Sequence, residues 1–341
     1  MSSVLFVSCH QIMPKVVWFF RRKRELGNFS IENSFRELLP HFEGSKWEIE
    51  WKEASCFSQG FMNRLKIALE ARKLEADIIH ITGDINFAAL FLRGRKVILT
   101  IHDNGFLNDC KGWRRWVMKK VWLDWPLRNC AQVVAVSNAT KQSILKYTCY
   151  PADKIQVIHS IVPSHFRRRK APPNNSKPVL LHIGLAENKN LHGHAQAIQG
   201  MDVKLRIIGE PSPDDQAMLQ SFGIDYEWRS KLTIEQMQEA YETSDLLLFC
   251  STLEGFGMPI LEAKAVGVPV VTSNFEPMNE VGKGYAVLVD PFNADAISKA
   301  VRRINKCNSS QDSNLNFTAT EAYERHRLLM TRLVREIAAE N

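Results

Sequence analysis

The chain has 341 residues, which favours two domains because single hydrophobic cores stop growing beyond roughly 250–300 residues. Its composition, 45% hydrophobic and 24% charged, excludes a disordered or fibrous chain. The formal net charge of +7 favours an anionic partner, such as a nucleotide, a phosphate group, a nucleic acid or an anionic lipid.

Four apolar runs in the first half of the chain predict buried strands: residues 4–8, 77–82, 96–103 and 132–137. Helical patterns separate them near residues 30–39, 60–74, 111–126 and 138–147. Strands that alternate with helices are typical of parallel sheets, so we expect an α/β domain at residues 1–165.

Five further runs predict a second parallel sheet: residues 154–160, 178–184, 203–210, 245–251 and 267–273. Residues 164–178 are basic and then rich in proline and asparagine, which is typical of a linker. We place the second domain at residues 166–317 and expect a helix at 318–341 that packs back on the N-terminal domain. Two such domains place a ligand in the cleft outside the carboxyl ends of their strands.

Residues 251–273 read STLEGFGMPILEAKAVGVPVVTS, a loop that leads into a helix and a strand. Gly255 and Gly257 let the backbone approach a ligand, and the N–H groups at the helix start attract an anion. Glu254 and Glu262 flank this turn. Their carboxylates would repel phosphate but would accept hydrogen bonds from the hydroxyl groups of a ribose and a sugar. The alternative is that both acids only stabilise the helix start.

This segment resembles the signature of the family 4 retaining glycosyltransferases, in which Glu-Gly-Phe-Gly precedes a second Glu and Gly-Val-Pro-Val-Val. Other stretches resemble the family in the same order along nearly the whole chain: ADIIHITGD, VILTIHDNGFL, VVAVSNATKQSI, LLHIGLAENKNL and EVGKGYAVLVDPFN. The resemblance implies the GT-B fold, in which two Rossmann-like parallel-sheet domains face a central cleft. It also implies a hexosyltransferase that moves a sugar from a nucleotide donor to an acceptor hydroxyl with retention.

The resemblance assigns roles to individual residues. Glu254 would hold the transferred sugar, Lys189 would contact the diphosphate, and His102 would contact the donor sugar across the cleft. A further set would bind the donor, with Glu262 on the ribose: Glu262, Gly184, Asn190, Gly255, Phe256 and Gly257. The loop at residues 226–232 would take the base.

The chemistry of transfer is compatible with a site that has no metal. Cleavage of the sugar–phosphate bond leaves negative charge on the diphosphate, which Lys189 and the helix start can stabilise. The sequence has no Asp-x-Asp motif, so we expect neither a metal nor another cofactor. Two positions depart from the family pattern. Leu185 stands where many members carry arginine, and SCHQIMPK follows the run at 4–8 instead of a glycine-rich loop.

Residues 111–129 read KGWRRWVMKKVWLDWPLRN, with six basic residues, one acid and four tryptophans. Tryptophan together with Lys and Arg on one helix is typical of a helix that lies on a membrane surface. The candidate membrane surface consists of five residues: Arg114, Arg115, Trp116, Lys119 and Lys120. The alternative is a solvated basic face with tryptophans packed into the domain. The RRKR run at 21–24 could extend the same surface.

Seven scattered cysteines without a Cys-x-x-Cys pair fit a reducing compartment, and no apolar run reaches the ~18 residues of a membrane-spanning helix. We therefore expect a cytoplasmic protein, peripheral on the inner face of the cell membrane. Its expected partners are a UDP- or GDP-linked sugar, a lipid-linked glycan acceptor of surface-polysaccharide assembly and the anionic membrane surface, but no nucleic acid. A nucleotide-sugar epimerase of the same fold, or a non-catalytic nucleotide-sugar-binding subunit, remains the alternative.

Overall fold

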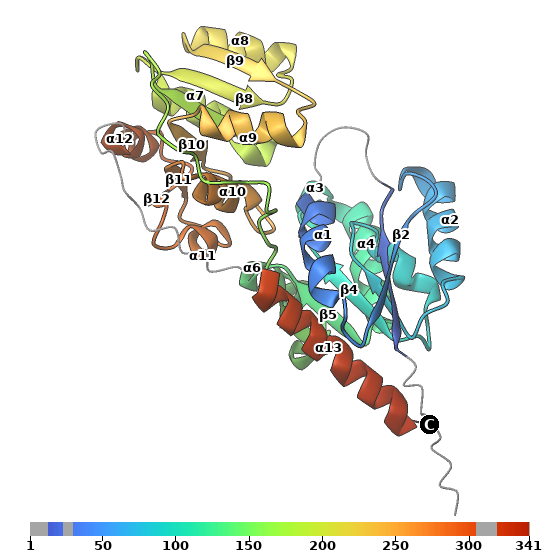
Figure 1. Ribbon diagram of the computed structural model, residues 1–341. Coiled ribbons are helices and arrows are strands. Elements are labelled where there is room, and N and C mark those ends of the chain that lie inside the picture. Colours follow the sequence, from blue (N-terminus) through green and yellow to red (C-terminus); the bar gives the residue numbers. More distant parts are fainter. Residues whose placement is uncertain (1–12, 23–29, 305–318, 341) are drawn as a thin grey trace, which may run out of the picture.

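The computed structural model describes residues 13–22, 30–304 and 319–340. In this part of the chain, two separate parallel sheets of six strands each form the frame of the protein (Figure 1). The first sheet comprises β1 (Lys15–Phe20), β2 (Glu48–Glu53), β3 (Ile78–Ile81), β4 (Val97–Ile101), β5 (Gln132–Ala135) and β6 (Ile155–Val157). The second comprises β7 (Val179–Ile183), β8 (Lys204–Ile208), β9 (Asp225–Arg229), β10 (Leu246–Phe249), β11 (Val270–Ser273) and β12 (Val287–Val289). The α/β prediction is thus confirmed.

Helices cover the faces of both sheets. With the first sheet are α1 (Ser30–Phe42), α2 (Gly60–Arg72), η1 (Asn86–Phe91), α3 (Phe106–Asp109), α4 (Gly112–Lys119), the π-helical turn η2 (Lys120–Asp124), α5 (Trp125–Arg128), α6 (Asn138–Tyr147) and η3 (Ala152–Lys154). With the second are η4 (Glu187–Lys189), α7 (Leu191–Ile198), α8 (Pro213–Ser221), α9 (Ile234–Glu242), α10 (Met258–Val266), α11 (Met278–Gly282) and α12 (Ala294–Ile304). The final helix is α13 (Ala319–Glu340).

Strand order explains where ligands can bind. The strand orders are β2-β1-β3-β4-β5-β6 and β12-β11-β10-β7-β8-β9. The side of the sheet on which successive strands are added therefore changes between β1 and β3 and between β7 and β10. In open α/β sheets, ligands bind outside the carboxyl ends of the strands at such reversal points. The loops after β7 and β10 are therefore the expected ligand-binding loops of the second sheet.

Alternate side chains of a strand point to opposite faces of its sheet, and both faces are buried because helices cover them. In β1, Val17 and Phe19 pack into the core that α2 and α5 cover. Val16, Trp18 and Phe20 pack into the opposite core, which also contains residues of α1 and α13. Burial on both faces explains why central strands appear as continuous apolar runs in the sequence.

The first described strand of the first sheet is one that the sequence analysis did not predict. The run at residues 4–8 lies outside the described residues, and the first described strand is β1 at Lys15–Phe20. Lys15, the last residue of SCHQIMPK, is the first residue of β1, and Arg21 and Arg22 follow this strand. Arg21 is also no part of an exposed basic surface. It is buried, and its guanidinium contacts the carboxylates of Glu32 and Asp84 at 3.0 Å each.

Edge strands account for the other differences. β2 and β9 were not predicted, because their partly exposed residues form no continuous apolar run. β12 was not predicted either, because its apolar run is only three residues long. The β9 strand contains residues 226–229, so four of the seven residues expected to form a base-binding loop are extended and paired with β8. The run at 154–160 was grouped with the second sheet, but its strand β6 pairs with β5 of the first.

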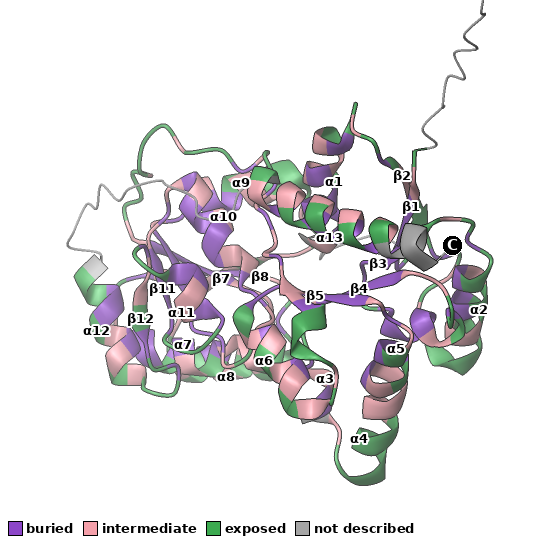
Figure 2. Ribbon diagram, turned by 90° about the horizontal axis from the view of Figure 1, so that it is seen from below, coloured by how far each residue is buried: buried purple, intermediate pink, exposed green. Residues whose placement is uncertain are grey.

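The C-terminal helix α13 crosses back to the first sheet, where both ribbon views place it beside β5 (Figures 1 and 2). The Tyr323 ring meets Phe42 of α1 edge-on, with 4.8 Å between centroids. Leu329 and Leu333 are fully buried in the same core, and Arg325 donates to the carbonyl of Val157 at 2.8 Å. The chain thus returns from the second sheet to help complete the core of the first.

Candidate functional site

The loops after β7 and β10 lie side by side, as their strand order requires. Asn188 Nδ2 donates to the carbonyl of Leu253 at 2.7 Å, and Thr252 N donates back to the carbonyl of Asn188 at 2.8 Å. Asn190 Nδ2 donates to the carbonyls of Cys250 and Pro291 at 3.1 and 2.8 Å. Both hydrogens of the Asn190 amide are therefore committed to protein carbonyls, and this side chain holds the two loops together.

Lys189 and Glu254, for which the sequence predicts opposite ligand groups, are paired with each other. Lys189 Nζ lies 2.5 Å from Glu254 Oε1, and the two side chains are 22% and 12% exposed. The ammonium also lies 5.2 Å from the centroid of the Phe249 ring. Gly184 has φ +88°, and a Cβ placed there would lie 3.1 Å from Lys189 Cγ. Glycine at 184 thus makes room for the lysine stem that brings its charge to Glu254.

Glu262 lies in α10, which begins at Met258 after Gly257 in the left-handed conformation (φ +98°). Its Oε2 accepts a hydrogen bond of 2.6 Å from the buried hydroxyl of Tyr241 in α9. Burial raises the pKa of Glu262 to about 7, while the Tyr241 hydrogen bond opposes that rise. Glu262 therefore changes charge near neutral pH. Within the described residues, its other oxygen has no hydrogen-bond donor and can accept a hydrogen bond. Tyr241 was missed because nothing in the sequence links positions 241 and 262.

Gly255 forms a contact between the two sheet domains. Its carbonyl accepts a hydrogen bond of 2.8 Å from Ser137 Oγ and lies 3.2 Å from Thr140 Oγ1. A Cβ at position 255 would lie 2.0 Å from the carbonyl oxygen of His102. The sequence predicts a glycine here that lets the backbone approach a ligand. The structure shows that Gly255 closely approaches the backbone of the first domain. Nearby, Phe256 is buried and its ring lies 5.8 Å from that of His159.

His102 follows β4 and is half-buried at this contact. Its Nε2 lies 2.7 Å from the carbonyl of Thr82, so Nε2 carries the proton and donates. The neighbouring Asp103 accepts a hydrogen bond of 2.8 Å from the N–H of Gly105. The structure brings the His102 backbone to Gly255 and places the ring beside a pocket of the first domain.

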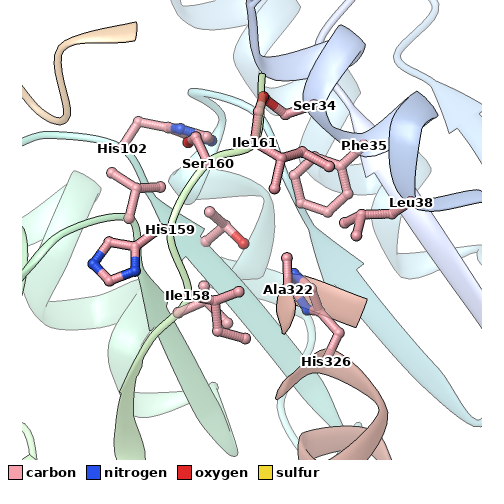
Figure 3. A pocket seen from close by; sticks show the side chains of 13 residues that line it. Ser34, Phe35, Leu38, His102, Ile158, His159, Ser160, Ile161, Ala322 and His326 are labelled. Atoms are coloured by element: carbon pink, nitrogen blue, oxygen red, sulfur yellow. The ribbon is translucent and has the colours of Figure 1, made fainter. Parts of the chain in front are cut away.

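That pocket lies between α1, α13 and the carboxyl ends of β4 to β6 (Figure 3). Its polar and aromatic lining includes Ser34, Phe35, His102, His159, Ser160 and His326. Burial lowers the pKa of His326 to about 4, so this side chain is neutral near pH 7. Apart from His102, these residues were missed, because they come from three segments that only the fold brings together.

In the tryptophan-rich segment at residues 111–129, some tryptophans are exposed, as a membrane-surface helix requires, and another is packed into the domain. Trp113 and Trp116 are 73% and 59% exposed, and the free end of α4 projects from the body of the protein (Figure 2). Trp122 instead packs on Phe87, with 5.1 Å between ring centroids, and under Arg64. No helix within the described residues is long and apolar enough to cross a membrane.

The basic residues of this segment also divide into two groups. Arg114 and Arg115 are exposed. The ammonium groups of Lys119 and Lys120 lie 2.8 and 2.7 Å from the carboxylate of Asp124. The two lysines are therefore partly neutralised, and the arginines provide the exposed positive charge of α4.

Comparison with known proteins follows the division into two sheets. The model of the family described as "Glycosyl transferases group 1" matches residues 164–320, and that of "Glycosyltransferase Family 4" matches residues 47–165. The O-antigen chain mannosyltransferase RfbU of Salmonella typhimurium is 27% identical over 62% of this chain and 62% of its own length. The O-antigen chain mannosyltransferase B of Escherichia coli is 31% identical over 49% of each. The chain thus spans about half to two thirds of these relatives.

Solved structures show the same fold. Anabaena HepE in complex with UDP and glucose superposes with a TM-score of 0.68 at 14% identity, covering 94% of this chain and all of that one. WaaG, a glycosyltransferase involved in lipopolysaccharide biosynthesis, superposes with a TM-score of 0.64 at 13% identity, covering 91% and 94%. These likenesses confirm the GT-B architecture.

Proposed function

The chain belongs to the family 4 glycosyltransferases of GT-B fold, and from this premise we propose that it transfers a hexose from a nucleotide sugar to an acceptor hydroxyl with retention. The observation that carries the proposal is the Lys189–Glu254 pair at the carboxyl ends of β7 and β10, where the strand order reverses. Lys189 offers a cation for the phosphate, and Glu254 offers a carboxylate that accepts hydrogen bonds from the hydroxyl groups of the sugar. The pair therefore matches the two halves of a sugar–phosphate bond.

Each charged group has a defined task in this proposal. As the sugar–phosphate bond breaks, Lys189 exchanges Glu254 for the departing diphosphate and stabilises its growing negative charge. Glu254 then accepts hydrogen bonds from hydroxyl groups of the transferred sugar, on which positive charge develops. Glu262 accepts from the ribose, and Tyr241 holds its carboxylate in place. These residues supply the charge stabilisation without a metal ion.

The face of the first domain around the small pocket beside His102 is the proposed approach for the acceptor. It lies next to the point where Gly255 reaches across from the second domain. Its side chains are apolar, aromatic and polar, and sites for small molecules combine apolar walls with a few placed polar groups.

We propose that the acceptor is a lipid-linked glycan of surface-polysaccharide assembly and that α4 rests on the cytoplasmic membrane face. The two curated relatives are named as O-antigen chain mannosyltransferases, which supports such an acceptor. Exposed tryptophans beside exposed arginines on α4 support contact with anionic headgroups. A UDP- or GDP-linked donor fits the predicted ribose and diphosphate contacts.

The test begins with thermal unfolding of the purified protein in the presence of UDP-, GDP-, ADP- and TDP-sugars, because a ligand that binds only the folded state raises the melting temperature. The stabilising donor is then incubated with lipid-linked glycans, with and without EDTA, and the product's anomeric configuration is determined by NMR. Formation of a retained glycoside in EDTA is expected. Binding without turnover, or epimerisation of the sugar alone, would contradict the proposal.

A further inference from the structure

Two buried histidines join the loops on either side of the candidate donor site. We propose that His182 and His194 form a hydrogen-bond relay that positions the peptide group between Gly184 and Leu185 for the donor diphosphate. Both are positioning residues that act through the backbone. This inference rests on the proposed function, because it assigns the diphosphate to that peptide group.

The relay is a continuous chain of three contacts. The backbone N–H of Cys250, just after β10, donates to His194 Nε2 at 3.1 Å. His194 Nδ1 lies 2.8 Å from His182 Nδ1. His182 Nε2 lies 2.7 Å from the carbonyl oxygen of Gly184, just after β7. The rings meet edge-on, with centroids 4.9 Å apart, and are 0% and 1% exposed for His194 and His182.

Only one arrangement of protons satisfies all three contacts. A backbone N–H can only donate, so His194 Nε2 must be unprotonated and His194 carries its proton on Nδ1. That proton is donated to His182 Nδ1, so His182 carries its own on Nε2 and donates it to the Gly184 carbonyl. Burial, which lowers the pKa of His182 to about 4 and that of His194 well below its ordinary value, keeps both rings neutral.

The relay fixes the direction of one peptide group. Since a trans peptide is planar, a Gly184 carbonyl held toward the buried His182 ring turns the N–H of Leu185 to the opposite side, away from the core. Within the described residues, this N–H has no hydrogen-bond acceptor. Gly184, at φ +88°, is the residue whose peptide can turn most easily. The relay therefore holds a free N–H at the loop that carries Lys189.

This arrangement gives a role to a departure from the family pattern. Leu185 stands where many members carry an arginine. Its backbone N–H can still donate a hydrogen bond, because a backbone donor does not depend on the side chain. The other end of the relay binds Cys250, whose carbonyl accepts from Asn190. The loops that carry Lys189 and Glu254 are thus held through both peptide groups of Cys250 and through that of Gly184.

Two substitutions at one position separate the relay from simple burial. His182→Gln places an amide nitrogen near the position of Nε2 and keeps the donation to Gly184, but loses the acceptor for His194. His182→Asn places an oxygen near Nδ1 and keeps that acceptor, but does not reach Gly184. Each leaves one buried partner unsatisfied, so both should lose comparable stability. Only the His182→Asn variant should lose the fixed orientation of the Leu185 N–H.

Calorimetric titration with UDP and GDP should show that His182→Asn binds its nucleotide roughly tenfold more weakly than His182→Gln, as expected for one hydrogen bond to a charged group. Equal affinities in two folded variants would overturn the relay. If the wild type binds neither nucleotide, the proposed function fails as well, and that result is distinct because it precedes any substitution.

A spectroscopic measurement tests the relay without a ligand. In ¹⁵N-labelled wild-type protein, the imidazole nitrogen shifts should show the proton of His194 on Nδ1 and that of His182 on Nε2, unchanged from pH 6 to 8. His182→Asn should leave the His194 tautomer in place, because its oxygen still accepts from Nδ1. A proton on His194 Nε2 in the wild type would overturn the arrangement.

Discussion

The contact between Lys189 and Glu254 makes a prediction about each residue separately. Glu254→Gln removes the charge that neutralises Lys189, so binding of the nucleoside diphosphate without its sugar should be unchanged or tighter. Transfer should nevertheless fall ~10²-fold or more, because an acceptor of the sugar's hydroxyl groups is weakened in the transition state. Lys189→Ala should reduce both transfer and diphosphate affinity.

Steady-state kinetics and calorimetry measure these two effects. Lys177→Ala is the matched control, since Lys177 also forms ion pairs, with Asp202 and Asp225, but at the amino ends of the strands of the second sheet. Wild-type turnover by folded Glu254→Gln protein would remove Glu254 from the mechanism.

Glu262 predicts a pH dependence of donor binding. Its pKa is raised from an ordinary value of 4.5 to about 7, so its carboxylate forms, and donor affinity should rise, as the pH increases from 6 to 8. Tyr241→Phe removes the hydrogen bond that lowers this pKa and should shift the profile to higher pH. Glu262→Gln should flatten it. A profile of Glu262→Gln identical to that of the wild type would contradict the assignment.

The same shift has a consequence for stability, whose sign follows from proton linkage. The folded protein retains the Glu262 proton between pH 4.5 and about 7, where the unfolded chain has lost it. The contribution of Glu262 to the free energy of unfolding should therefore decrease as the pH rises through this window. Urea unfolding of the wild type and of Glu262→Gln across this pH window isolates the contribution of Glu262 to the free energy of unfolding.

At the scale of single elements, α4 predicts membrane binding. Each exposed Lys or Arg near an anionic bilayer adds about 1 kcal/mol, and the exposed Trp113 and Trp116 can enter the headgroup region. Arg114→Glu/Arg115→Glu should abolish co-sedimentation with anionic liposomes. The loss from Arg114→Ala/Arg115→Ala should exceed that from Lys119→Ala/Lys120→Ala, because Asp124 already pairs with both lysines.

Arg302→Glu/Arg303→Glu is the control for net charge, since these two exposed arginines also neighbour each other but lie on α12 of the second domain. Binding should weaken with salt, because charges are screened over about 8–10 Å near physiological ionic strength. If wild type ignores anionic liposomes, or if both charge reversals act equally, α4 is only a solvated basic face.

Elements also show where sequence patterns were sufficient. Buried central strands such as β4 and β10 appear as continuous apolar runs, because both of their faces are covered. The helix α10 follows from its Gly-Phe-Gly turn. The edge strands β2 and β9 carry partly exposed polar and aromatic side chains, so their sequences do not differ from those of loops. Pairing with a neighbouring strand, which the sequence does not display, makes them strands.

At the scale of the whole molecule, Gly255 predicts a dependence of catalysis on domain contact. Gly255→Ala would place a Cβ 2.0 Å from the His102 carbonyl oxygen, so the domains must separate locally. Transfer should fall strongly, while nucleotide affinity, which depends on the second domain, should change little. Small-angle scattering should show a larger radius of gyration. Ser137→Ala removes a hydrogen bond at the same contact without adding bulk and should have a smaller effect.

The sequence by itself determined the α/β class, the family and the loop–helix segment with its two glutamates, because these depend on local periodicity and on a motif within one segment. Only the tertiary structure showed that Lys189 pairs with Glu254, 65 residues away, that Tyr241 holds Glu262 and that His182 contacts His194. It also showed that Gly255 meets the first domain. These contacts depend on which strands become neighbours and on how loops from different segments meet. Parallel strands are joined through long crossovers, so residues that share a site are distant in sequence and leave no common local pattern.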